Sequence, residues 1–157
     1  MGILKKSVLY FGFAAILALI SFASCEKEEN ENETKVSSYN SDESHNAGQN
    51  CMSCHKPNGS GEGWFTIAGT VYDSSKTSPY PNTTVKLFTG IAGSGILKAT
   101  VEVDKYGNFY TTENIDFGFG LYTSVNGNSN TNHMNSPITT GQCNSCHGVS
   151  TDKIWTK

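Results

Sequence analysis

The stretch LKATVEVD, residues 97–104, alternates apolar and polar side chains at every second position. An alternation with a period of two predicts a β-strand with one buried and one exposed face. The face expected to be buried begins with Leu97 and continues at every second residue. Segment 85–87 alternates in the same way, and segments 64–72 and 120–125 are rich in aromatic and β-branched residues. No part of this middle region has a convincing helical period, so the sequence predicts a mainly β fold.

Turn signals rich in Pro, Gly, Asn and Asp separate these segments, at residues 79–81, 90–95 and 104–108. The order of strands and turns resembles the carboxypeptidase regulatory-like (transthyretin-like) fold. The matching residues are Gly69-Thr70-Val71-Tyr72-Asp73, Pro81, Val85-Lys86-Leu87, Asp104-Lys105-Tyr106-Gly107-Asn108-Phe109 and Tyr122. The resemblance implies a small Greek-key β-sandwich, which we expect over residues 61–126. Such sandwiches serve as spacers, scaffolds or ligand-presenting modules, so the fold alone does not give the function.

The apolar residues are unevenly distributed along the chain. After residue 25 there are 21 Leu, Ile, Val and Phe residues, and 17 of them lie between Trp64 and Val125. The middle of the chain therefore has enough apolar surface to fold by itself, whereas the segments on either side of it do not. If these two irregular flanking segments are ordered, something other than side-chain burial has to order them.

Both flanking segments carry the same five-residue motif, Cys-x-x-Cys-His, which is the attachment motif of c-type haem. Two thiols three positions apart can bond both vinyl groups of one porphyrin, and the adjacent His then becomes the proximal ligand of the iron. The two motifs predict two covalently bound haem c groups. The expected thioether anchors are Cys51, Cys54, Cys143 and Cys146, and the expected proximal ligands are His55 and His147.

Three other interpretations of the cysteines remain open. A structural zinc site could use both Cys pairs, but 88 residues lie between Cys54 and Cys143. Zinc modules place their ligand pairs roughly 12–20 residues apart. Two Cys-x-x-Cys redox disulfides do not explain the His after each pair, and simple structural disulfides do not explain it either.

Two histidines remain, one upstream of each motif. His45 precedes Cys51 and His133 precedes Cys143, so two haems with two spare imidazoles suggest bis-His ligation. Met134 is the rival of His133, and a Met/His pair would raise the reduction potential. Either spare His could serve the haem of its own motif or the other haem.

The motifs and the upstream histidines resemble those of small multihaem c-type cytochromes of the periplasm or outer membrane. The resemblance covers a first haem segment, residues 45–60, and a second, residues 127–157, and it implies electron transfer rather than catalysis. A haem enzyme or sensor with one open iron site is an alternative, because spare His residues that do not ligate would leave an iron accessible. A haem-free scaffold or adhesion lipoprotein is a third possibility.

The N-terminus predicts export and lipid anchoring. Residues 1–24 form a signal peptide with two lysines and the apolar run 8–20, too short for a membrane span. The run ends before Cys25 in a sequence that resembles a bacterial lipobox, so Cys25 is the expected lipid attachment site. Residues 25–44 are acidic and polar and are expected to be a disordered tether. Within them, segment 27–29 resembles a surface-export signal, which favours the outer cell surface over the periplasmic face of the outer membrane.

The charge of the chain indicates its partners. The formal net charge is −3, and all eleven basic residues are Lys. The lack of Arg argues against nucleic-acid binding, because Arg makes most bidentate contacts to bases and phosphates. We expect the membrane, through the lipid, and a redox protein with a basic docking surface as partners.

Overall fold

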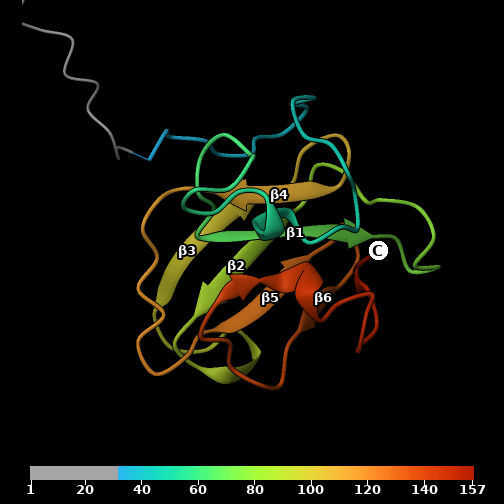
Figure 1. Cartoon of the computed structure of the whole chain (residues 1–157). Coiled ribbons are helices and arrows are strands. Elements are labelled where there is room, and N and C mark those ends of the chain that lie inside the picture. Colours follow the sequence, from blue (N-terminus) through green and yellow to red (C-terminus); the bar gives the residue numbers. More distant parts are fainter. Residues whose placement is uncertain (1–31) are drawn as a thin grey trace, which may run out of the picture. The chain divides into compact units, whose positions relative to one another are not determined.

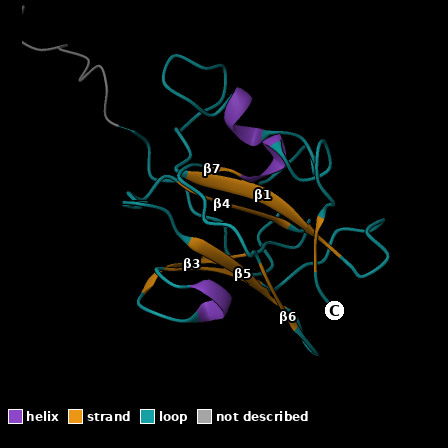
Figure 2. Ribbon diagram, turned by 90° about the horizontal axis from the view of Figure 1, so that it is seen from below, coloured by secondary structure: helices purple, strands orange, loops and turns teal. Residues whose placement is uncertain are grey.

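Two β-sheets packed face to face make up the part of the chain that the computed structural model describes, residues 32–157 (Figure 2). This confirms the expected mainly β fold and its sandwich architecture. The expected signal peptide over residues 1–24, the lipid site Cys25 and the first residues of the tether lie outside the described residues.

Eight strands build the two sheets (Figure 1). The first sheet has the order β4-β1-β7, and β8 also pairs with β1; the second has the order β3-β2-β5-β6. All neighbours are antiparallel except β7 and β8, which run parallel to β1. The strands are β1 (Ile67–Tyr72), β2 (Thr84–Phe88), β3 (Leu97–Glu102), β4 (Asn108–Thr111), β5 (Tyr122–Asn126), β6 (Thr131–His133), β7 (Gly141–Gln142) and β8 (Ile154–Trp155).

The main core lies between the sheets. In β2, Val85 and Leu87 are buried and the residues between and beside them are not, which is the predicted alternation. Val85 pairs with Val101 of β3 on one side and with Val125 of β5 on the other. Every residue of β1 is buried. On the face of β1 that points away from the main core, Ala68 packs with Phe65 and Tyr110 in a second, smaller cluster.

Leu97 departs from the prediction for its strand. It is 48% exposed, whereas Val101 and Val103 of the same alternating stretch are buried. β3 is an edge strand of its sheet, and its first residues extend past the core. The alternation therefore identified the strand and its inward face correctly, but not where along the strand the core ends.

The turn predicted at 104–108 is present and leads into β4, a strand that the sequence analysis did not separate from it. The buried carboxylate of Asp104 accepts hydrogen bonds from the backbone N–H groups of Tyr106 and Asn108, at 2.9 and 3.0 Å. Gly107 has φ +79°, a left-handed conformation that side chains other than glycine rarely adopt. The turn thus folds β4 back along the sandwich.

The segment expected to be a disordered tether is packed against the sandwich over residues 32–44. Val36 forms a β-bridge with Thr111, and Ser37 is only 2% exposed. The Ser37 hydroxyl donates to the carbonyl of Glu102 at 2.6 Å and accepts from the N–H of Tyr110 at 2.9 Å. Composition did not indicate this packing, because backbone groups and a hydroxyl hold the segment rather than apolar side chains.

The expected limit of the sandwich at residue 126 is also too early. Residues 127–157 were expected to be irregular, yet they supply β6, β7 and β8. These strands have only two or three residues each, and most of those residues are polar. They join the sheets by backbone pairing, which leaves no hydrophobic alternation in the sequence.

Helical structure within residues 32–157 is limited to three 3₁₀ turns, which are η1 (Cys51–Ser53), η2 (Ile91–Gly93) and η3 (Cys143–Ser145). In this part of the chain no helix has the length and apolarity needed to cross a bilayer. Two of the three turns contain the Cys-x-x-Cys-His motifs, so the motifs are the main departure from β structure.

Candidate functional site

The two Cys-x-x-Cys-His motifs have the same local structure. In each, the N–H of the His donates to the carbonyl of the first Cys, at 3.0 Å for His55 and for His147. In each, the Ser at the third position donates to the carbonyl just before the motif, at 2.7 Å for Ser53 and 2.6 Å for Ser145. Residues three apart in a 3₁₀ turn lie on the same face, so each turn presents its two thiols together.

Both motif histidines are fixed in the same tautomer. The Nδ1 of His55 lies 2.8 Å from the backbone carbonyl of Glu62, and the Nδ1 of His147 lies 2.6 Å from that of Asp152. A carbonyl oxygen only accepts, so Nδ1 carries the proton and Nε2 keeps its lone pair. Metal-ligating histidines have this arrangement, in which the outer nitrogen donates to a carbonyl and orients the ring.

The ring of His55 is further held by its neighbours. Phe65 stacks on it, with ring centroids 4.1 Å apart and planes 9° from parallel, and Tyr110 stacks on Phe65 at 4.8 Å. Gly61 also lies against the ring of His55. A Cβ added to Gly61 would be 2.8 Å from the ring, which is too close unless the ring moves. Three independent contacts therefore set the position of this imidazole before any ligand binds.

A cavity of about 410 Å³ lies at the first motif, beside β4, whose residues Asn108 and Tyr110 line it. His45, His55, Cys51, Cys54 and Tyr110 are among its lining residues. Pockets for cofactors are roughly 300–1,000 Å³, so the volume is in the right range for one.

The structure brings His45 close to His55, the histidine of its own motif, whereas the sequence analysis left open which of the two motifs His45 would serve. Their ring centroids are 5.9 Å apart and their planes are inclined by 39°. Two imidazoles bound to one metal, each with a metal–nitrogen bond of about 2 Å, have ring centres roughly 6 Å apart. The separation of the two ring centroids thus matches that of two axial ligands on opposite sides of one iron.

Hydrogen bonds to the sandwich position the turn that follows His45. The N–H of Gly48 donates to the hydroxyl of Thr70 on β1 at 2.8 Å, and Gly48 has φ +84°. The side-chain amide of Asn108 on β4 donates to the hydroxyl of Ser44 at 2.9 Å. β1 and β4 therefore hold the segment before the first motif in place on both sides of His45.

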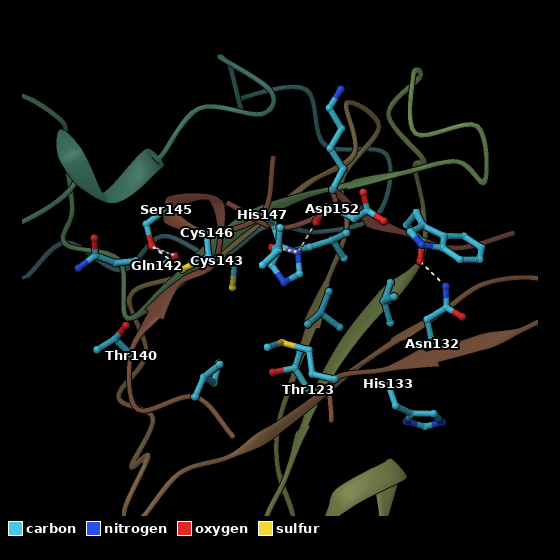
Figure 3. A pocket seen from close by; sticks show the side chains of 18 of the residues that line it. Thr123, Asn132, His133, Thr140, Gln142, Cys143, Ser145, Cys146, His147 and Asp152 are labelled. Atoms are coloured by element: carbon cyan, nitrogen blue, oxygen red, sulfur yellow. Dashed lines mark hydrogen bonds between the residues drawn. The ribbon is translucent and has the colours of Figure 1, made fainter. Parts of the chain in front are cut away.

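The second motif lines a larger cavity, of about 600 Å³ (Figure 3). This cavity opens between the two sheets, and its lining includes Val85 and Val125 of the second sheet and Ile154 of β8. Cys143, Cys146 and His147 line the opposite side. The second site is thus partly inside the sandwich, whereas the first lies on its outer surface.

The structure does not bring His133 to His147. His133 pairs with Ser124 of β5, and its Nδ1 lies 2.7 Å from the Ser124 hydroxyl. Its ring also lies next to Gly93 of η2, where an added Cβ would be 3.4 Å from Cε1. Figure 3 shows the side chain of His133 directed away from Cys143, Cys146 and His147.

Met134 occupies the next position and lines the second cavity. Successive side chains of a strand point to opposite faces, so Met134 is on the cavity side when His133 is on the other. The sequence analysis named both residues as candidates, but it could not tell which face of this short polar strand each would occupy.

The second motif is bonded to the segment just before the first, although 88 residues separate their cysteine pairs. The side-chain amide of Asn144, inside the second motif, donates to the carbonyl of Gln49 at 2.9 Å and to the hydroxyl of Thr70 at 3.1 Å. Its carbonyl oxygen accepts from the N–H of Thr70 at 3.2 Å. Asn144 and Thr70 are functional positions that the sequence analysis missed, because only the fold shows what they join.

The four cysteines of the described residues are free thiols. Burial, with a smaller contribution from Cys51 nearby, raises the pKa of Cys143 to about 12, and burial raises the pKa of Cys51 as well. Hydrogen bonds from Ser60 and Ser53 lower the pKa of the exposed Cys54. In the metal-free and haem-free chain the two inner thiols are therefore protonated at neutral pH, and the thiolate is the reactive form of cysteine.

Comparison with family models, with curated proteins and with solved structures found no match to this chain. Within residues 32–157, no three His, Cys, Asp or Glu side chains are grouped so that they could hold a metal ion. The chemistry of the candidate sites is therefore argued from their own residues.

Proposed function

We propose that the protein is a dihaem c-type cytochrome that transfers electrons, anchored by a lipid on Cys25 at the bacterial outer membrane. The observation that carries the proposal is the repetition of one local structure. Both motifs present two thiols on one face of a turn and an imidazole whose Nδ1 is fixed on a backbone carbonyl. A c-type haem needs this set of groups, whereas disulfides give no role to the oriented imidazole.

The residues divide into anchors and ligands. Cys51 and Cys54 hold the first haem and Cys143 and Cys146 the second, each pair through thioether bonds. His55 and His147 are the proximal ligands, and His45 completes the first site. A bound haem supplies one-electron redox chemistry, while the chain orients the ligands and excludes water from part of each site.

The contact between the motifs supports electron exchange between the two haems of one chain. Asn144 bonds to Gln49 and Thr70, so both attachment turns rest on β1. Because the sandwich inserted between the motifs brings them together, it acts as the scaffold of the pair. Electron transfer to other proteins would then use the exposed sides of the two sites.

One observation favours a second candidate function, a haem enzyme or sensor with an open iron at the second site. His133, expected as a ligand there, is turned away, and the cavity is the larger of the two. An accessible iron with a cavity beside it would bind a small ligand. A haem-free scaffold or adhesion protein has no comparable support, since it would not need the paired imidazole geometry.

The partners proposed are the membrane and a redox protein. The acidic chain, with a formal net charge of −3, favours a basic docking surface on that protein, and nucleic acid is not a proposed partner. Display at the cell surface is proposed over the periplasmic face. Cys25→Ala should move the protein from the membrane fraction to the soluble fraction without changing its haem content.

The test is to produce the full chain with c-type haem-maturation machinery. A haem-stained band should survive boiling in denaturing gels, and the visible spectrum should show two haems per chain. Cys51→Ala with Cys54→Ala should leave one haem, and the same pair of changes at Cys143 and Cys146 should leave the other. An intact chain without covalent haem would contradict the proposal.

A further inference from the structure

The two candidate sites differ in what lies across from the motif histidine. At the first site a second imidazole, that of His45, lies with its ring centroid 5.9 Å from that of His55. At the second site the upstream imidazole, that of His133, is on the far side of its strand (Figure 3). The structure therefore does not repeat the ligand pair of the first site.

His133 is held in its outward position by a buried partner. Ser124 is 3% exposed, and its hydroxyl bonds to Nδ1 of His133 at 2.7 Å. Turning the imidazole into the cavity would break this bond and would require a change in the register of β6 against β5. A buried hydroxyl left without a partner costs about 1–3 kcal/mol, so the outward position is stabilised independently of any cofactor.

Met134 is on the cavity side of the same strand end. Its N–H donates to the carbonyl of Thr123 at 2.8 Å, which ties its backbone to β5, and its side chain lines the cavity together with His147. The side chain has three rotatable torsions and ends in a soft thioether, so it can adapt its reach within the cavity. A thioether is an established axial ligand of haem iron.

A buried hydroxyl without a partner lies beside the same cavity. The hydroxyl of Thr123 is buried and has no hydrogen-bond partner, although Thr123 lines the cavity across from His147 (Figure 3). A buried donor without a partner is rare in folded proteins. The sulfur of Met134, which is a weak acceptor, would give this hydroxyl a partner.

We propose that Met134, not His133, is the second axial ligand at the His147 site, so that the protein holds one bis-His haem and one His/Met haem. The inference rests on the proposed function. Met/His ligation raises the reduction potential relative to bis-His ligation. With haem bound at both sites, His45 and His55 would hold the lower-potential iron and His147 and Met134 the higher-potential one, so one electron would move from the first site to the second with no bond in the chain formed or broken.

The experiment uses the full chain loaded with haem and compares Met134→Leu, Met134→His and His133→Ala. Leucine keeps the volume of methionine and removes only the sulfur, so it separates ligation from packing. The readouts are the far-red charge-transfer band of methionine bound to ferric haem, the spin state, and a redox titration. Thermal unfolding of each variant checks its fold.

The wild-type protein should show the methionine band and two separate redox waves. Met134→Leu should abolish the band and convert one of the two haems to a high-spin or water-ligated form. Met134→His should keep both haems low-spin and bring the two waves together, which also tests the site if the leucine variant folds poorly. His133→Ala should leave band, spin state and waves unchanged.

A loaded wild-type protein without the methionine band would overturn the inference. So would a high-spin haem produced by His133→Ala, and so would a wild-type second haem that is already high-spin, which would favour the open-iron function. Failure of the proposed function looks different, because the chain would then carry no covalent haem at all.

Discussion

Asn144 is a buried polar residue whose side chain is fully used. It is 4% exposed and bonds to the N–H and hydroxyl of Thr70 and to the carbonyl of Gln49. The corresponding position of the first motif holds Met52, which packs on the small cluster of Phe65, Ala68 and Tyr110 instead. One motif is thus attached by apolar packing and the other by hydrogen bonds, and Asn144 joins the two.

Asn144→Ala should destabilise the haem-loaded protein by about 1–3 kcal/mol, because it leaves the buried N–H of Thr70 without an acceptor. The measurement is the urea unfolding midpoint. Ser145→Ala, in the same turn, removes an exposed hydrogen bond to the carbonyl of Gln142; it is the matched control and should have a smaller effect, because water can replace its partner. Equal effects of the two changes would contradict the bridging role of Asn144.

The thiol of Cys143 should react slowly in the folded, haem-free chain. Because its pKa is raised to about 12, almost none of it is thiolate at neutral pH, and thiolate is the reactive form. Cys54, which is exposed and has a lowered pKa, should be alkylated by iodoacetamide first. Alkylation of Cys143 should speed up as the pH rises towards 12, as measured by peptide mass spectrometry. Similar rates for both thiols at neutral pH would disagree with the burial of Cys143.

β1 is the element on which both motifs depend. Its residue Thr70 accepts a hydrogen bond from Gly48, before the first motif, and bonds to Asn144, inside the second. Thr70 also donates to Asn108 of β4 at 2.7 Å. One strand near the centre of the first sheet therefore carries the two sites on its outer face and at its edge (Figure 2).

Thr70→Val should loosen the turn at Gly48 while keeping the shape of β1. Valine has the volume of threonine but lacks the hydroxyl that Gly48, Asn108 and Asn144 use, so the amide of Gly48 should exchange its hydrogen faster. Hydrogen exchange of the haem-loaded protein measures this. Thr100→Val, on the exposed face of β3, is the control. Unchanged protection of Gly48 would mean that another contact holds the turn.

Strands in which apolar residues recur at every second position were predictable from the sequence, and short strands made mostly of polar residues were not. The alternation in 85–87 and 97–104 identified β2 and β3, because one face of each has to be buried. β6, β7, β8 and the packed segment 32–44 escaped prediction, since backbone hydrogen bonds on sheet edges attach them and leave no apolar pattern.

The same distinction applies to the candidate sites. The haem-attachment roles of the motif residues stay a prediction, and it rests on local spacing that the sequence shows directly. The choice between His133 and Met134 was not predictable, because neighbouring residues of a strand lie on opposite faces and a shift of one residue exchanges them. Both residues line the cavity, and only the pairing of His133 with Ser124 shows that the imidazole is turned towards the other face.

At the scale of the whole molecule, the sandwich places one site on its outer surface and the other at the open edge between its sheets. This gives the two sites different surroundings within one folded unit. The formal net charge of −3 is the basis of the proposed preference for basic partners.

Electron transfer to a basic redox protein should slow as ionic strength increases. Opposite charges steer the encounter, and salt screens them over a Debye length of about 10 Å at 0.1 M. Stopped-flow rates measured across a series of salt concentrations test this, with an acidic redox protein of similar potential as the control. A rate with the basic partner that does not depend on salt would contradict charge steering.

The most direct test of the central claim is the intact mass of the mature chain after denaturation, reduction and alkylation. The account predicts the mass of two haems added to the chain and no alkylation at Cys51, Cys54, Cys143 or Cys146, because all four sulfurs are thioethers. Disulfides or zinc thiolates would instead give four alkylated cysteines and no haem mass, and that result would contradict the account.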